Sequence, residues 1–204
     1  MSYCTIDGEY RNKIEIKHSV FICSISEIKS FNEGAEFVKK ISKEFSDATH
    51  NCYAYIGLNG EQKFSDDGEP DKTAGMPILN VLKGQNLENV ACVVTRYFGG
   101  IKLGTGGLVS AYSDSAKLCL EIAKIKVMVD CNIYCLDFSY SDFKLASKLI
   151  CEFGKILDTK YDINISIRFA IPIEKIDSFS KKLSEQFNGN ILLGTPLETA
   201  NINI

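Results

Sequence analysis

Residues 96–107 read RYFGGIKLGTGG and hold five of the chain's fifteen glycines. They follow the apolar run VACVVT at residues 90–95, which is typical of a buried strand. They precede LVSAYSDSAKLCLEIAK at residues 108–124, where apolar side chains recur near helical spacing. The stretch therefore predicts a glycine-rich turn between a central strand and a long helix.

The segments upstream of this turn predict strands and helices in one mixed domain. Residues 9–28, EYRNKIEIKHSVFICSISEI, alternate apolar and polar positions in two runs, which predicts paired strands. Ser30 and Glu33 have the spacing of a capping box at the start of a helix. HNCYAYIGL at residues 50–58 predicts a strand, Asn59-Gly60 a hairpin, and residues 78–82 a short helix.

The segments downstream repeat more regularly. YCLDFSY predicts a strand, SDFKLASKLICEF a helix, KILDTKYD and INISIRFAIP two strands, and a further helix precedes a last strand at NILLGTPLETA. The order βαββαβ is that of a ferredoxin-like split βαβ domain. We therefore predict an α+β protein of two domains, residues 1–127 and 128–204.

Composition excludes several classes of protein. Lys and Arg number 23 against 26 Asp and Glu, the net charge is −3, and neither half is basic, so bulk charge does not drive nucleic-acid binding. The chain has no secretory leader pattern and no run of ~18 apolar residues, so we expect a cytoplasmic protein with no membrane partner. Eight cysteines without a CxxC pair are typical of reduced thiols, and we expect no metal or cofactor.

The glycine stretch resembles two phosphate-binding motifs and fits neither. Gly99 and Gly104 have the spacing of a P-loop, but Thr105 stands where the phosphate-binding lysine belongs. Gly104 and Gly106 begin a dinucleotide fingerprint, but Val109 replaces its third glycine. We therefore expect no ATP or GTP hydrolysis of the P-loop kind, and the dinucleotide fingerprint is incomplete.

A glycine-rich turn entering a helix still offers open N–H groups and the positive end of the helix dipole to an anion. Arg96 and Lys102 flank the turn and add positive charge. Two other interpretations remain open: glycines that only permit close packing, or a partner surface made by Tyr97, Phe98 and Ile101. The predicted anion- or RNA-binding residues are Arg96, Gly99, Gly100, Lys102, Gly104, Thr105, Gly106 and Gly107.

A second polar stretch, SDDGEPDKTAG at residues 65–75, groups four carboxylates at Asp66, Asp67, Glu69 and Asp71. They could hold a hard cation or form an acid–base pair, or they could cap backbone N–H groups in a solvated turn. His50 and Cys52 fall on one face of a predicted strand. They could be a ligand pair, a catalytic dyad or simply packed side chains. The predicted loop beside the glycine turn comprises His50, Asp66, Asp67, Glu69, Thr73 and Gly75.

Three stretches in order, DATHNCYAY, FSDDGEPDKTAGMPIL and VVTRYFGGIKLGTGGLVSAY, resemble the IMPACT/YigZ family over about residues 15–125. The βαββαβ segment resembles the second domain of bacterial members. The resemblance implies an N-terminal domain folded like a small-subunit ribosomal protein domain and domain four of elongation factor G. It also implies a ferredoxin-like domain like that factor's domain five, and a role in translation.

Two departures from the family pattern alter the expected charge of the site. Val20 stands where arginine is usual in the segment Lys17 to Phe21, and Asp71-Lys72 replaces small residues. We expect a non-enzymatic, translation-associated regulatory protein that binds RNA, the ribosome or a translation-related protein, with no catalytic residue. The alternatives are a hydrolase-like enzyme acting on a phosphorylated or nucleotide substrate through His50 and the acidic loop, and a pure protein-interaction module.

Overall fold

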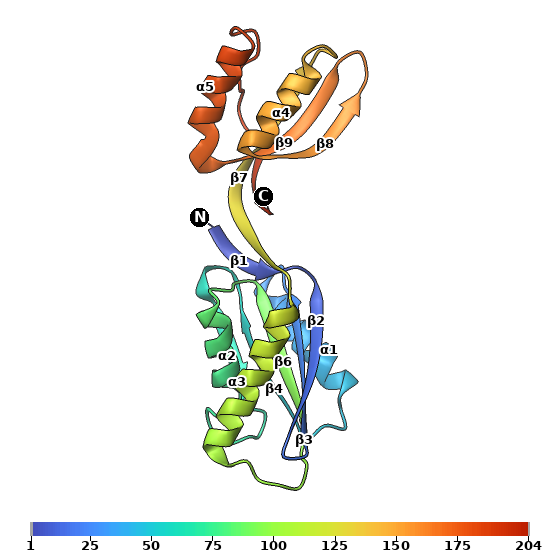
Figure 1. Cartoon of the computed structure of the whole chain (residues 1–204), viewed down its shortest axis with the longest axis vertical. Helices are drawn as coiled ribbons and strands as arrows, with labels where there is room; N and C mark the ends of the chain where they lie inside the picture. The colour runs from blue at the N-terminus through green and yellow to red at the C-terminus, as the bar shows by residue number, and fades with distance from the viewer. Residues whose placement is uncertain (1, 204) are drawn as a thin grey trace. The chain divides into compact units, whose positions relative to one another are not determined.

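The computed structural model describes residues 2–203 and combines helices and strands, which confirms the α+β class (Figure 1). The chain divides into two compact units, one of which is Tyr3–Lys126. Residues 127–203 form the other unit together with Ser2. Each unit has its own hydrophobic core, and each is described separately below.

The first unit is built on an antiparallel sheet with the strand order β2-β3-β6-β4-β5. Its strands are β2 (Glu9–Ile16), β3 (Ser19–Glu27), β4 (His50–Ile56), β5 (Gln62–Ser65) and β6 (Val90–Tyr97). The preceding β1 (Ser2–Ile6) bridges to Leu87 through Cys4. The central strand β6 is buried over seven of its eight residues, as its continuous apolar run predicts.

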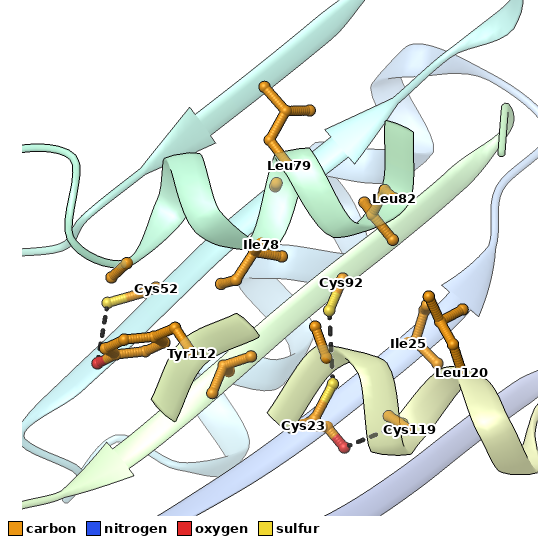
Figure 2. Packing of buried hydrophobic residues seen from close by; sticks show 14 of the residues in the cluster. Cys23, Ile25, Cys52, Ile78, Leu79, Leu82, Cys92, Tyr112, Cys119 and Leu120 are labelled. Carbon is orange, nitrogen blue, oxygen red and sulfur yellow. Dashed lines mark hydrogen bonds between the residues drawn. The ribbon is translucent and has the colours of Figure 1, made fainter. Parts of the chain in front are cut away.

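Three helices cover the two faces of this sheet (Figure 1). α1 (Phe31–Glu44) packs on one face, while α2 (Gly75–Gly84) and α3 (Gly104–Ile122) pack on the other. The predicted cap of α1 is confirmed, because Ser30 Oγ accepts a hydrogen bond from the Glu33 N–H at 3.3 Å. Figure 2 shows the core beneath α2 and α3, to which α2 contributes Ile78 and Leu82 and α3 contributes Tyr112.

The connections confirm the predicted strand pair and the predicted hairpin. Lys17 and His18 join β2 to β3 with φ of 46° and 64°, the backbone of a type I′ turn. β4 joins antiparallel β5 through a short 3-10 turn, η1 (Leu58–Gly60). The sheet therefore forms as the alternating patterns predict.

Three predicted boundaries are wrong. α2 begins at Gly75 rather than near residue 78, because carboxylate capping at the end of the acidic loop lets the helix start earlier. α3 begins at Gly104, so three of the five glycines form its first turn instead of a loop. The last strand covers only residues 198–203, and the apolar residues at 191–193 lie outside any strand.

The second unit has the predicted βαββαβ order and is confirmed as ferredoxin-like. Its elements are β7 (Ile125–Phe138), α4 (Phe143–Phe153), β8 (Lys155–Tyr161), β9 (Ile165–Pro172), η2 (Ile173–Lys175), α5 (Ile176–Gln186) and β10 (Glu198–Asn203). The strands pair antiparallel in the order β8-β9-β7-β10, the arrangement of a split βαβ repeat. Phe169 and Phe179, with ring centroids 5.5 Å apart, lie in the core between the sheet and the helices. None of the helices within residues 2–203 is long and apolar enough to cross a membrane.

Candidate functional site

A buried ion pair lies beside the glycine stretch. Arg96, near the end of β6, contacts Glu69 of the acidic loop, with Nη1 2.6 Å from Oε1. The two side chains are only 5% and 4% exposed. The prediction that Arg96 offers an open charge to a ligand is therefore wrong, because the fold uses this guanidinium to neutralise a buried carboxylate.

Aromatic rings and a tyrosine hydroxyl complete this pair. The Arg96 guanidinium lies 5.5 Å from the ring centroids of both Phe21 and Phe98. The Tyr112 hydroxyl of α3 donates to Glu69 Oε1 at 2.7 Å. Elements β3, β6, α3 and the acidic loop thus meet at one charged, hydrogen-bonded centre that fixes where the glycine stretch leaves the sheet.

Gly99 anchors the glycine stretch to the β2–β3 turn. A Cβ atom at this position would lie 2.0 Å from the carbonyl carbon of His18, so only glycine allows the approach. The Gly99 N–H donates to Ser19 Oγ at 3.2 Å, and Arg96 Nη2 donates to the same oxygen at 3.4 Å. The packing interpretation therefore holds for Gly99, whose N–H group has a partner within the protein.

The carboxylates of the acidic loop cap backbone N–H groups. Asp66 Oδ1 accepts from Ala74 and Gly75 at 2.9 and 2.8 Å, and its Oδ2 accepts from Lys72 at 2.9 Å. These bonds satisfy open N–H groups at the start of α2.

The neighbouring loop residues are held in the same way. Asp67 Oδ2 accepts from the Asn51 N–H at 2.7 Å. The Thr73 hydroxyl donates to the Pro70 carbonyl at 2.6 Å. No group of three or more His, Cys, Asp or Glu side chains in residues 2–203 is arranged to hold a metal ion. The capping interpretation of this loop is the one that the geometry supports.

His50 and Cys52 of β4 lie near each other in sequence but take part in different contacts. His50 Nδ1 lies 2.7 Å from the Asp67 carbonyl oxygen, and Nε2 lies 4.0 Å from Glu69 Oε2. Cys52 Sγ lies 3.3 Å from the Tyr112 hydroxyl oxygen (Figure 2). Burial raises the pKa of the Cys52 thiol and the pKa of Tyr112, so both groups stay protonated and uncharged. A nucleophilic dyad of His50 and Cys52 is not formed.

The start of α3 is the open part of the site. Leu103 is its N-cap residue, and the Leu103 side chain makes no capping hydrogen bond. Gly104, which begins the helix with φ of 75°, is exposed together with Thr105 and Gly106. The first N–H groups of a helix have no partner within the helix, and the glycines add no side chains around them. Lys102 is exposed immediately before this turn.

A pocket of about 360 Å³ joins the ion pair to the helix start. Its lining residues are Glu69, Pro70, Arg96, Phe98, Lys102, Leu103, Gly104, Thr105 and Leu108. Of the predicted anion-binding residues, four line the pocket, while Gly100 lies in the preceding loop and Gly106 and Gly107 continue the helix.

The apolar wall of this pocket and the role of Tyr112 as a partner of Glu69 are not evident in the sequence. Leu108 and Tyr112 belong to the apolar stripe that the spacing at residues 108–124 predicts, and that stripe gives no sign that one end opens on a pocket. Phe98 was considered only as a partner contact. Its position directly after a buried strand, followed by two glycines, is the one signal that could have identified it.

Comparison with known proteins extends over both units. Residues 17–120 match the family described as the Impact N-terminal domain, and residues 136–190 match a domain of unknown function, DUF1949. The IMPACT family member YvyE of Bacillus subtilis is 37% identical over 92% of this chain and 88% of its own length. The IMPACT family member YigZ of Escherichia coli is 35% identical over 88% and 90%. A crystal structure of a hypothetical protein, 32% identical, aligns with a TM-score of 0.62 over 97% of this chain and 98% of its own. The chain therefore belongs to the IMPACT family.

Proposed function

We propose that this protein is a translation-associated regulatory protein that binds phosphate groups of RNA, free or within the ribosome, at the start of α3. The uncapped first turn of α3, beside the exposed Lys102, is the observation that carries the proposal. Membership of the IMPACT family supports the link to translation, through the role that the family resemblance implies.

The physical basis is the field at the helix start. Backbone N–H groups and the helix dipole favour an anionic oxygen there, and the glycines let it approach the backbone closely. Lys102 adds a charge-assisted contact of the kind that phosphate oxygens accept. With a net charge of −3, the chain relies on this local arrangement instead of bulk attraction.

Arg96 has a different part in this proposal from the one that its sequence position suggests. Because it is buried against Glu69, it positions the Phe98 ring and the β2–β3 turn instead of contacting phosphate. Loss of Arg96 would therefore weaken binding through the shape of the site. Lys102 is the residue whose removal changes the charge presented to the ligand.

Binding to ribosomes and to RNA across a salt series tests the proposal. Lys102→Ala is expected to weaken binding. It should also reduce the slope of log K against log salt by about 1, the change that loss of one phosphate contact produces. Lys43→Ala is the matched control, because Lys43 is an exposed lysine on α1, which covers the opposite face of the sheet. Equal binding by wild type and Lys102→Ala at every salt concentration would contradict the proposal.

A protein partner is the second candidate function, favoured by two exposed apolar side chains. Phe98 and Ile101 are 47% and 44% exposed in the loop before α3. Apolar contacts are little screened by salt, so a protein partner held by this loop would stay bound at high ionic strength. The same salt series therefore separates the two candidates.

A further inference from the structure

Resting on the proposed function, we propose that the pocket between Phe98 and the start of α3 receives one unstacked nucleotide of a single RNA strand. Its base would pack against Phe98, and its phosphate would meet the N–H groups of Gly104 and Thr105. The proposal thus defines the ligand more closely than phosphate binding does, because it requires a base that is free to leave a double helix.

The shape of the pocket fits a ring as well as an anion. Its volume of about 360 Å³ is within the usual range for small-molecule sites, roughly 300–1,000 Å³. Phe98, Leu103 and Leu108 give it an apolar wall, and Gly104 and Thr105 give it an open polar edge. A site for phosphate alone has no use for an apolar wall, whereas a nucleotide presents both kinds of surface.

Phe98 is held in place as a stacking platform. The Arg96 guanidinium lies 5.5 Å from its ring centroid, and its backbone N–H donates to Thr49 Oγ1 at 3.0 Å. The residue nevertheless remains 47% exposed. Recognition of single-stranded RNA commonly uses bases stacked on such aromatic side chains, and a fixed ring loses little entropy on binding.

One donor of the Arg96 guanidinium is left unsatisfied beside the pocket. Arg96 lines the pocket and is only 4% exposed, yet its Nε atom has no hydrogen-bond partner within residues 2–203. A buried donor without an acceptor is costly and uncommon in folded proteins. Because Nε itself is buried from solvent, a ligand in the pocket would meet it only if the Arg96 side chain shifted.

Fluorescence anisotropy with labelled RNA tests the proposal, using one sequence as a single strand and as a duplex. We expect the single strand to bind more tightly. Phe98→Ala is expected to weaken single-strand binding by roughly 5- to 150-fold, the range for loss of one stacked base. Phe98→Trp should retain binding, since it keeps an aromatic face. Ile101→Ala, an exposed apolar side chain of the same loop outside the pocket lining, should bind like wild type.

A second arm uses a nucleoside monophosphate as the probe, to separate a free nucleotide from one in a strand. Competition by the monophosphate that depends on Phe98, together with tighter binding of the strand, supports the proposal. Binding of the monophosphate without binding of any RNA would show a site for free nucleotides and would overturn it.

The remaining outcomes separate this proposal from the one on which it rests. Equal binding of single strand and duplex, with Phe98→Ala like wild type and Lys102→Ala weakened, would overturn the nucleotide pocket and leave phosphate binding intact. A parallel loss in Phe98→Ala and Ile101→Ala would indicate a general apolar surface and would also overturn it. Absence of binding to both RNA forms would contradict the proposed function itself. Circular dichroism of each variant confirms that it is folded.

Discussion

Replacing Arg96 with methionine would leave Glu69 as a buried carboxylate without its cation. The two side chains are 5% and 4% exposed, and their closest atoms are 2.6 Å apart. Removing one partner of a buried pair costs about 3–5 kcal/mol, because the remaining charge stays desolvated. Methionine keeps most of the side-chain volume, so the loss reports the charge more than a cavity. We therefore expect the free energy of unfolding of the Tyr3–Lys126 unit to fall by about 3–5 kcal/mol.

The double variant Arg96→Met/Glu69→Gln isolates the charge pair. Glutamine can still accept the hydrogen bond of Tyr112, but it carries no charge, so the double variant should be less destabilised than the sum of the single ones. Urea unfolding followed by far-UV circular dichroism measures each free energy, and hydrogen exchange of β6 peptides assigns the loss to this unit. A cost below about 1 kcal/mol for Arg96→Met, or strict additivity, would refute the buried pair as the centre of the site.

Further predictions concern the glycines, the acidic loop and the thiols. Gly99→Ala should destabilise the first unit by about 1–3 kcal/mol or more, because the added methyl overlaps the backbone of the β2–β3 turn. Gly106→Ala has no atom within 4 Å of the new methyl and should stabilise α3 by about 0.5–1 kcal/mol; thermal and urea unfolding check both changes. Asp66→Ala should cost about 1–2 kcal/mol through loss of the α2 cap, with faster hydrogen exchange confined to the first turn of that helix. An aromatic disulfide reagent at mildly alkaline pH should label Cys135 and Cys151 first, since both are exposed, and the five buried thiols only on unfolding; early labelling of a buried thiol, read by mass spectrometry, would be inconsistent with this core.

Most of the fold could be predicted from the sequence because its local patterns agree with its packing. The two alternating runs before residue 28 pair as β2 and β3, and Ser30 caps α1 as its spacing requires. The βαββαβ order of the second unit likewise follows from the spacing of apolar residues, which changes along the chain between the strand repeat and the helix repeat. The helix start at Gly104 could not be predicted in this way, because glycine is a poor helix former and is normally assigned to a turn. Contacts of α3 with the sheet override that preference.

The location of the candidate site could be predicted from the sequence, but the roles of its charged side chains could not. The glycine stretch and the acidic loop do meet, as their order in the family pattern suggests. Whether Arg96 faces solvent or the interior depends on Glu69, which lies 27 positions earlier in the sequence and reaches it only in the folded state. The capping role of Asp66 likewise depends on where α2 begins. Such long-range pairings leave no periodic pattern in a single sequence.

Amide chemical shifts of the glycines report directly whether RNA phosphate binds at the start of α3. With glycine-selective ¹⁵N labelling, a single-stranded RNA oligonucleotide is titrated into the protein while the glycine amide signals are followed. We expect the signals of Gly104 and Gly106 to shift with saturation, and those of Gly34 in α1 and Gly154 in the second unit to stay unchanged. Saturable RNA binding with unchanged Gly104 and Gly106 signals would show that the start of α3 is not where the phosphate binds.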